Sequence, residues 1–390
     1  MSAPTLHIVH GQPSWSLKTA QVDVHLTKLG GHLGPVVFHL GGKPISPFSI
    51  APWAEEKLAP DTPALLRALR GDFFCAPFGG NGTPFKGETH PPHGETANAS
   101  WRLQAFESAA GRQTLHARLD TTVRAGSVDK FITLMQDQTV VYQEHRVNAR
   151  GPMTVGHHAM LKFPPTPGSG IVSTSRFVHA QVLPDLFERP EAQGYTALKT
   201  GVTFRKLDRV PLLNGGFTDL TSYPARRGFD DLVMLTADPK LPFAWNAVTY
   251  PKDGYVYFAL RDPGTLRHTL LWISNGGRHY APWNRRHTDV MGIEDTTSYF
   301  HYGLAESAKP NPHSRRGIPT SLNLNPKKPL SVRYLFGVAA IPRNFDRVQS
   351  IEAARGGIEL VAANGRRTVA AVNLDFLRPD GTLDSVSRPT

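Results

Sequence analysis

The sequence predicts an all-β protein, a large antiparallel β-sandwich with few short helices. Short runs rich in β-branched and aromatic residues alternate at period two, and turn formers separate them about every 10–15 residues. Gly and Pro number 35 and 33 among 390 residues, which is frequent enough to interrupt most candidate helices. The length suits two average domains or one large sandwich, and a hydrophobic content of 40% is ample for a core.

Six segments show the strand pattern most clearly. They are residues 20–26, 101–106, 113–119, 130–134, 139–147 and 255–260. Helical signals are few: residues 62–69 predict one short helix, and residues 344–355 predict another that ends at Gly356-Gly357.

Long loops rich in Pro and Gly are expected over residues 76–97, 162–170 and 279–320, and such loops often carry function. We expect one sandwich domain over residues 1–342. Residues 343–390 are expected to form a helix-plus-hairpin extension packed on the same domain, with the hairpin turning at Asn364-Gly365.

Lys and Arg number 43 and Asp and Glu 32, so the formal net charge is +11. A basic chain raises the question of nucleic-acid binding, but the basic residues are scattered and no basic run is interleaved with stacking aromatics. We therefore expect a generally basic surface and no nucleic-acid partner.

No run of about 18 apolar residues occurs, which predicts no transmembrane helix and no membrane partner. The first residues lack a basic start followed by an apolar stretch, so we expect no signal peptide and a cytoplasmic location. Cys75 is the one cysteine, which excludes an intramolecular disulfide and argues against a Cys-based zinc site. Its apolar neighbours predict a buried thiol rather than a nucleophile.

Three constellations could carry chemistry, and the first is the loop from His90 to Trp101. Two His flank a rigid Pro-Pro, and a Trp opens the next strand. His93 could donate to a polar ligand while Trp101 offers an apolar ring face. The alternative is a stiffened loop with exposed His and a core Trp.

The second constellation is the adjacent pair His157 and His158 within a predicted strand. Their side chains must point to opposite faces, so at most one of them faces a given pocket. An imidazole there could act as a general acid near neutral pH, or it could be a hydrogen-bonded structural residue.

The third constellation is the segment 291–300, in which Glu294 follows an apolar trio and enters a polar stretch. Such a position suits a carboxylate at the rim of a sheet, where burial could raise its pKa and make it a usable base. The alternative is that Glu294 and Asp295 form a solvated strand end.

Metal and other cofactor chemistry has weaker support. His90, His93 and one of His157 and His158 could make a three-His site, but no compact His-x-x-x-His spacing supports it. A phosphate-binding Walker loop and the Gly-x-Ser-x-Gly signature are also missing. We expect no metal and no cofactor.

In this order, the three constellations resemble the galactose mutarotase (aldose 1-epimerase-like) superfamily. His93 to Trp101 is similar to the family's His-Gly-Phe-Ala-Arg-Asn-x-x-Trp stretch, His158 to its His-Thr-Tyr-Phe strand, and Gly292 to Thr296 to its late Glu-containing loop. Further similarity lies in residues 30–36, 70–74, 321–326 and 330–336, so the resemblance spans roughly residues 15–340. It implies the galactose mutarotase-like supersandwich.

The resemblance implies interconversion of sugar anomers by ring opening, with Glu294 as base and His158 as acid. Neither metal nor cofactor is needed, because two titratable groups on opposite sides of one sugar suffice. His93 would hold a sugar hydroxyl, and the further substrate-binding candidates are Trp101, Arg70, Asp72, His287 and His157. The implied partner is a small-molecule carbohydrate, and the implied state is a monomer or homodimer.

Two positions depart from the family pattern: its usual Arg is Ala97 here, and its usual aromatic is Glu95. These departures leave open a carbohydrate-binding protein that has lost turnover. A third hypothesis is polysaccharide lyase or hydrolase chemistry on the same type of sandwich, for which the basic charge would suit acidic glycans.

Overall fold

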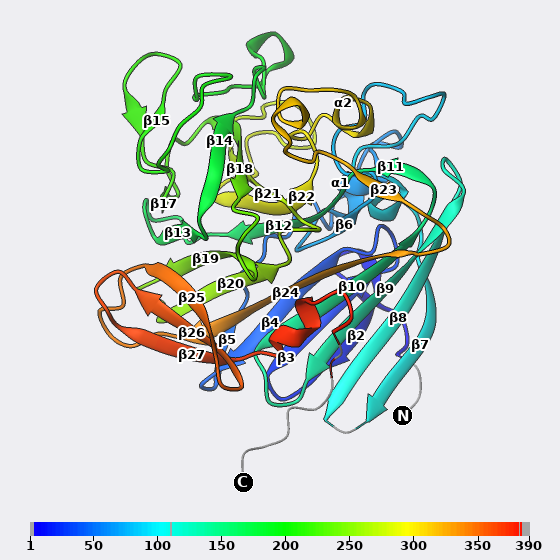
Figure 1. The fold of residues 1–390 in the computed structure, drawn as a ribbon, viewed down its shortest axis with the longest axis vertical. Helices are drawn as coiled ribbons and strands as arrows, with labels where there is room; N and C mark the ends of the chain where they lie inside the picture. The colour runs from blue at the N-terminus through cyan, green and yellow to red at the C-terminus, as the bar shows by residue number, and fades with distance from the viewer. Residues whose placement is uncertain (1–3, 110, 382, 384–390) are drawn as a thin grey trace.

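The computed structural model describes residues 4–109, 111–381 and 383. In this part of the chain the largest sheet has nine antiparallel strands, in the spatial order β17-β13-β19-β20-β24-β10-β9-β8-β7 (Figure 1). Their bounds are β7 (Arg102–Ala109), β8 (Arg112–Thr121), β9 (Gly126–Met135), β10 (Val140–Asn148), β13 (Gly170–Thr174), β17 (Ser222–Tyr223), β19 (Ala244–Tyr250), β20 (Tyr255–Arg261) and β24 (Leu330–Ala340).

A second sheet of six described strands carries the candidate site, in the order β14-β18-β21-β22-β12-β6. Its strands are β6 (Phe74–Cys75), β12 (Val155–Lys162), β14 (Phe177–Val182), β18 (Phe229–Ala237), β21 (His268–Asn275) and β22 (Val290–Thr297). The strands pair antiparallel throughout.

Among the described residues, smaller sheets, two short helices and four 3-10 turns accompany these two sheets. A five-stranded sheet contains β1 (His7–Val9), β2 (Gln12–Lys18), β3 (Val22–Thr27), β4 (Leu33–Leu40) and β5 (Lys43–Ile45). Two ribbons pair β11 (Gly151–Met153) with β23 (Leu322–Leu324), and β15 (Val210–Pro211) with β16 (Phe217–Thr218). The α-helices are α1 (Ala64–Ala68) and α2 (Leu304–Ala308), and 3-10 turns lie at Glu95–Ala97, Pro190–Ala192, Ser314–Arg316 and Leu374–Leu377.

The predicted all-β class and its six clearest strands are confirmed, by β3, β7, β8, β9, β10 and β20. Two expectations are wrong. The segment predicted as helix 344–355 contains strand β25 (Val348–Ala354), because its apolar residues Val348 and Ile351 pack on the sandwich and its backbone pairs with the next strand. The expected loop 279–320 contains strand β22 and helix α2.

Both faces of the six-stranded sheet are covered, and the two-residue period of a strand decides to which face each side chain points. Odd-numbered residues of β22 such as Ile293 join the main core, which lies between this sheet and the nine-stranded sheet. Even-numbered residues such as Val290, together with Trp272 of β21 and Met160 of β12, join a second cluster under the loops on the outer face. The candidate site lies on this outer face.

Residues beyond 342 form a three-stranded sheet of β25, β26 (Gly357–Ala362) and β27 (Arg367–Ala371). The turn between β26 and β27 is where Asn364-Gly365 was predicted to make it. Ile358 and Leu360 are buried in the same hydrophobic cluster as Trp245 and Phe258 of the nine-stranded sheet. Part of the predicted extension, residues 382 and 384–390, lies outside the described residues.

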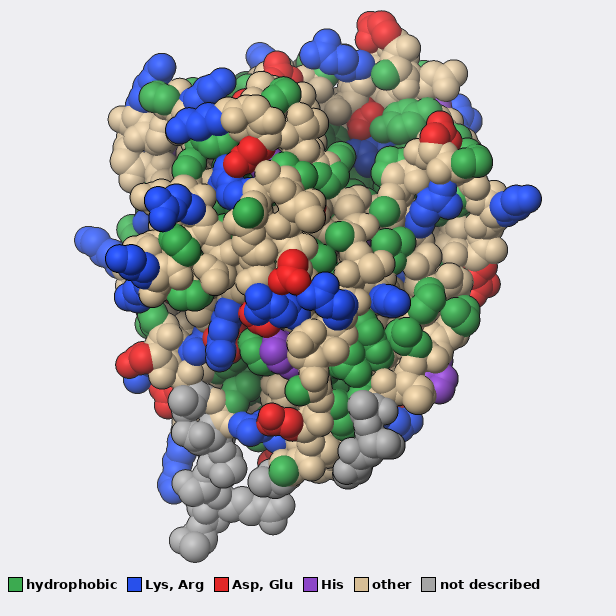
Figure 2. All heavy atoms as spheres, turned by 90° about the vertical axis from the view of Figure 1, so that its right-hand side faces the viewer, with side chains coloured by type: hydrophobic (Ala, Val, Ile, Leu, Met, Phe, Trp, Pro, Cys, Tyr) green, Lys and Arg blue, Asp and Glu red, His purple; other side chains and the backbone are tan. Residues whose placement is uncertain are grey.

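None of the described helices is long and apolar enough to cross a membrane. Lys and Arg side chains are spread over the face shown in Figure 2, among acidic and neutral ones, with several in a band across its middle.

Candidate active site

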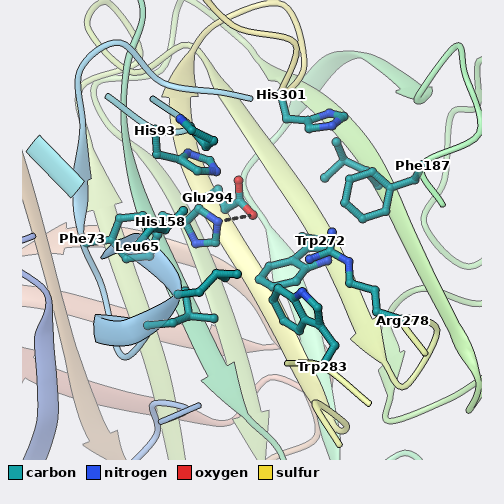
Figure 3. A pocket seen from close by; sticks show the side chains of 14 residues that line it. Leu65, Phe73, His93, His158, Phe187, Trp272, Arg278, Trp283, Glu294 and His301 are labelled. Atoms are coloured by element: carbon teal, nitrogen blue, oxygen red, sulfur yellow. Dashed lines mark ion pairs between the residues drawn. The ribbon is translucent and has the colours of Figure 1, made fainter. Parts of the chain in front are cut away.

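Glu294 and His158 meet because β22 and β12 pair antiparallel with these two residues directly opposite one another. Both face the outer side of the sheet, and Nε2 of His158 lies 3.3 Å from Oε1 of Glu294 (Figure 3). Glu294 was expected at a sheet rim. It lies instead within β22 and is 2% exposed, so the alternative of a solvated strand end is wrong.

A cavity of about 140 Å³ opens onto this pair. Strands supply its floor, and the loops around α1, His93, Phe187, Trp283 and His301 supply its walls. The lining residues are Leu65, Leu66, Leu69, Phe73, Pro92, His93, His158, Phe187, Leu232, Trp272, Arg278, Trp283, Glu294 and His301. A cavity of about 150 Å³ is large enough for benzene, so this one accommodates a single six-membered ring.

Burial sets the protonation of the pair. It raises the pKa of Glu294 to about 8, against the opposing effect of the Arg278 charge, and Asp295 adds a smaller upward contribution. Burial also lowers the pKa of His158 well below its usual range. At neutral pH the resting pair is therefore a carboxylic acid beside a neutral imidazole, with one exchangeable proton between them.

His93 is brought to the same cavity by the loop before Trp101. Its backbone has φ +59°, and its N–H donates to the Gly79 carbonyl at 2.7 Å, which fixes the ring edge-on to His158 at 4.9 Å. Burial lowers its pKa to about 3, so the imidazole is neutral. Among the described residues, Nδ1 of His93 is buried without a hydrogen-bond partner, and the ring lines the cavity where a ligand can reach it.

Most of the cavity lining was not predicted from the sequence, including the polar and aromatic residues Trp272, Arg278, Trp283 and His301. Trp272 lies on β21 and faces the cavity, and Arg278 and Trp283 follow in the loop between β21 and β22. The signal available was their position: Trp283 and His301 lie within the expected loop 279–320, and Arg278 directly precedes it. Aromatic and Arg side chains there suit a ligand-binding wall.

Three predicted substrate-binding residues lie elsewhere. Arg70 is buried and donates to the carbonyls of Ala68, Val9 and His10, so it ties the chain together below the site. His157 points to the opposite face from His158, as the strand pattern predicted, and its Nδ1 lies 2.8 Å from a carboxylate oxygen of Asp72. Asp72 itself is fully buried in the main core.

Trp101 and His287 also do not line the cavity. Trp101 is buried and donates from Nε1 to the Thr96 carbonyl, with the Lys130 ammonium 5.2 Å from its ring centroid. The alternative of a core Trp is thus confirmed. His287 stacks behind Trp272 at 5.5 Å and supports the cavity wall from outside.

Ala97 and Glu95, the two residues that depart from the family pattern, also have structural roles. Ala97 is buried, and its carbonyl accepts from Nε2 of His32 at 3.1 Å. Glu95 points away from the cavity and accepts from the backbone N–H groups of Thr122 and Val123.

The three-His arrangement does not form. Within the described ranges, no group of three or more His, Cys, Asp or Glu side chains is placed to hold a metal ion. Nε2 of His90 lies 2.9 Å from the Glu88 carboxylate instead. Cys75 is buried, as predicted.

No family model and no curated protein matches the sequence, but the structure matches many solved ones. A protein from Synechocystis has 14% identity and a TM-score of 0.55, covering 87% of this chain and 98% of its own. A galactose mutarotase-like protein from Clostridium acetobutylicum has 12% identity and a TM-score of 0.55, covering 86% and 98%. A galactose mutarotase related enzyme from Lactobacillus acidophilus has 13% identity and a TM-score of 0.52, covering 84% and 97%.

These likenesses extend over most of each chain at low identity. The resemblance stated from the sequence motifs is confirmed at the level of the fold. This chain has the galactose mutarotase-like fold.

Proposed function

We propose that this protein is an aldose 1-epimerase-like isomerase that interconverts the anomers of a free sugar. The observation that carries the proposal is the Glu294–His158 pair, buried at 3.3 Å on the floor of a cavity the size of one six-membered ring. Anomer exchange needs one base and one acid on a single ring, and the cavity supplies both.

In the reactive form, the shared proton is on His158 and Glu294 is a carboxylate. Glu294 takes the proton from the anomeric hydroxyl as the bond between the anomeric carbon and the ring oxygen breaks. His158 protonates the ring oxygen, which leaves an open-chain aldehyde, a protonated Glu294 and a neutral His158. Rotation about the first carbon–carbon bond and reversal of both transfers close the ring as the other anomer, and the pair regains its starting protonation.

The resting pair and the reactive pair contain the same number of protons and differ only in where one proton lies. The net charge of the pair is zero both as carboxylic acid and imidazole and as carboxylate and imidazolium. Burial of the pair therefore does not require a net charge in the cavity.

Among the described residues that line the cavity, Glu294 is the one carboxylate. Hydrolysis of a glycosidic bond generally uses two carboxylates on either side of that bond. This lining supports an isomerase over a hydrolase.

The alternative is a carbohydrate-binding protein without turnover, which the buried Ala97 favours because the family's Arg is missing there. The deciding experiment follows freshly dissolved aldoses to anomeric equilibrium by NMR, with and without protein. Acceleration that is lost in Glu294→Gln and in His158→Ala, by more than about 10²-fold, supports the isomerase. Ligand-induced shifts for one sugar with no acceleration would establish a binding protein and overturn the proposal.

A further inference from the structure

Arg278 is fixed in the cavity wall by aromatic rings and carboxylates. Its guanidinium carbon lies 4.4 Å from the ring centroid of Trp283, 5.1 Å from that of Trp272 and 5.2 Å from that of Phe187 (Figure 3). Its Nε donates to Oε1 of Glu188 at 2.7 Å. A planar group stacked among three rings and hydrogen-bonded at one corner has few orientations available to it.

The opposite end of the same guanidinium is unused. A guanidinium has five N–H donors, and only Nε is hydrogen-bonded within the described part of the chain. Nη1 and Nη2 have no hydrogen-bond partner among the described residues, and the side chain is 16% exposed where it lines the cavity. Up to four N–H groups are therefore available to a ligand beside Glu294.

The positive charge of Arg278 is already compensated. The Glu188 carboxylate is 2.7 Å from Nε, and the Asp230 carboxylate is 3.5 Å from it. Asp230 is held in place by Ser274 Oγ and the backbone N–H of Gly277. Arg278 is also the one Lys or Arg among the described lining residues, so no second cation makes the cavity positive.

We propose that Arg278 is the substrate-anchoring residue of this site, and that it donates through Nη1 and Nη2 to two neighbouring hydroxyls of an uncharged sugar. The carboxylates of Glu188 and Asp230 behind it disfavour sugars that carry a phosphate or carboxylate. This inference rests on the proposed function for the nature of the ligand, since it takes the ring in the cavity to be a sugar.

Arg278 thus has the role that the sequence resemblance suggested for Arg70. All the hydrogen bonds of Arg70 go to backbone carbonyls, and it does not reach the cavity. A guanidinium reaches the ligand in this chain from the β21–β22 loop instead.

The test is calorimetric binding of D-glucose, D-galactose, glucose 6-phosphate and glucuronate to the wild-type protein, alongside NMR rates of anomerisation. We expect a neutral hexose to bind at least about tenfold more tightly than either charged sugar. Arg278→Lys keeps the positive charge but loses the paired Nη1 and Nη2 donors of the guanidinium. It should weaken neutral-sugar binding about 10- to 100-fold and raise KM more than it lowers kcat. Arg367→Lys, on the exposed strand β27, is the matched control and should change neither quantity.

Glu188→Gln is the second variant, because Gln keeps an oxygen acceptor for Nε and removes one compensating charge. It should improve the binding of glucose 6-phosphate and glucuronate relative to glucose. Tighter binding of a charged sugar than of either hexose by the wild-type protein, or unchanged hexose binding in Arg278→Lys, would overturn the inference.

The two proposals fail in different ways. Sugar binding that depends on Arg278 without faster anomerisation overturns the isomerase and keeps the anchoring residue. Faster anomerisation with an unchanged KM in Arg278→Lys keeps the isomerase and overturns the anchoring residue. No binding and no acceleration overturn both.

Discussion

Gly292 lies two residues before Glu294 on the same face of β22, and a β-carbon on Gly292 would come within 2.7 Å of Oε1 of Glu294. The same β-carbon would be 3.1 Å from the side chain of Trp272. The missing side chain therefore leaves the space that the carboxylate occupies when it meets His158.

Gly292→Ala should displace the Glu294 carboxylate from His158 and reduce kcat for anomerisation by about tenfold or more, since a misplacement of about 1 Å can cost 10²-fold. The fold should persist, because the atom in the way is the end of a flexible side chain. NMR rates together with a thermal melt separate the two effects. Gly82→Ala is the control, because its new β-carbon meets nothing within 4 Å. Equal rates in the two variants would contradict the packing argument.

Buried histidines should make the protein unstable in acid. Burial lowers the pKa values of several of them, and in six it lowers the pKa to about 3 (His32, His93, His268 and His287) or to about 4 (His301 and His313). A histidine whose pKa is lowered in the folded protein stabilises the fold at pH values above its unfolded-state pKa near 6.5. This stabilisation is lost as the pH falls from 6.5 toward the folded-state pKa. Each group adds up to about 1.4 kcal/mol per pH unit, so six give up to about 8 kcal/mol per unit.

We therefore expect cooperative unfolding between about pH 6 and pH 4, since a domain has only about 5–15 kcal/mol in total. Circular dichroism against pH measures the midpoint. His268→Gln should make the pH dependence shallower, whereas His7→Gln, at an exposed position, should leave it unchanged. Retention of the native spectrum at pH 4 would be incompatible with this expectation.

Glu294→Gln should stabilise the protein above pH 4.5 while it removes activity. Burial raises the pKa of Glu294 to about 8 in the folded protein. The contribution of a carboxyl with a raised pKa to stability is complete below its unfolded-state pKa, and it is lost as the pH rises toward 8. Gln has no charge to bury, so its advantage should grow by up to about 1.4 kcal/mol per pH unit over that window. Urea unfolding of both proteins at pH 6.5, 7, 7.5 and 8, above the range of the expected acid unfolding, measures it. The exposed Glu352→Gln should show no such trend, and a constant difference for Glu294→Gln would disprove the assignment.

The sequence alone was sufficient for the fold class and for the three residues at the centre of the site. His158 and Glu294 were assigned as a pair in advance by the resemblance of their segments to the mutarotase motifs, and period two assigns His157 to the other face. Strand patterns are local, so they survive in any sandwich that buries one face of each strand.

The rest of the site depends on contacts between distant segments. The sequence near Arg70 resembles a pocket segment, but the direction of its guanidinium is decided by carbonyls of Val9 and His10, about sixty residues away. Likewise, helix propensity over residues 344–355 loses to the pairing of β25 with β26, because burial against the sandwich outweighs a weak local preference.

Leu360 of β26 tests whether the C-terminal sheet and the sandwich unfold together. Its side chain is fully buried among Trp245, Phe258 and Leu335 of the nine-stranded sheet, so Leu360→Ala should lower the free energy of unfolding by about 2–4 kcal/mol. Val369→Ala on β27 removes apolar atoms from a residue that is 69% exposed, and should cost less than about 0.5 kcal/mol. Since neither residue lines the cavity, KM and kcat should be unchanged in both variants. A single urea transition, shifted in Leu360→Ala alone, means that the two parts form one cooperative unit. Two separate transitions, with only the first shifted, would mean that the C-terminal sheet unfolds independently of the sandwich.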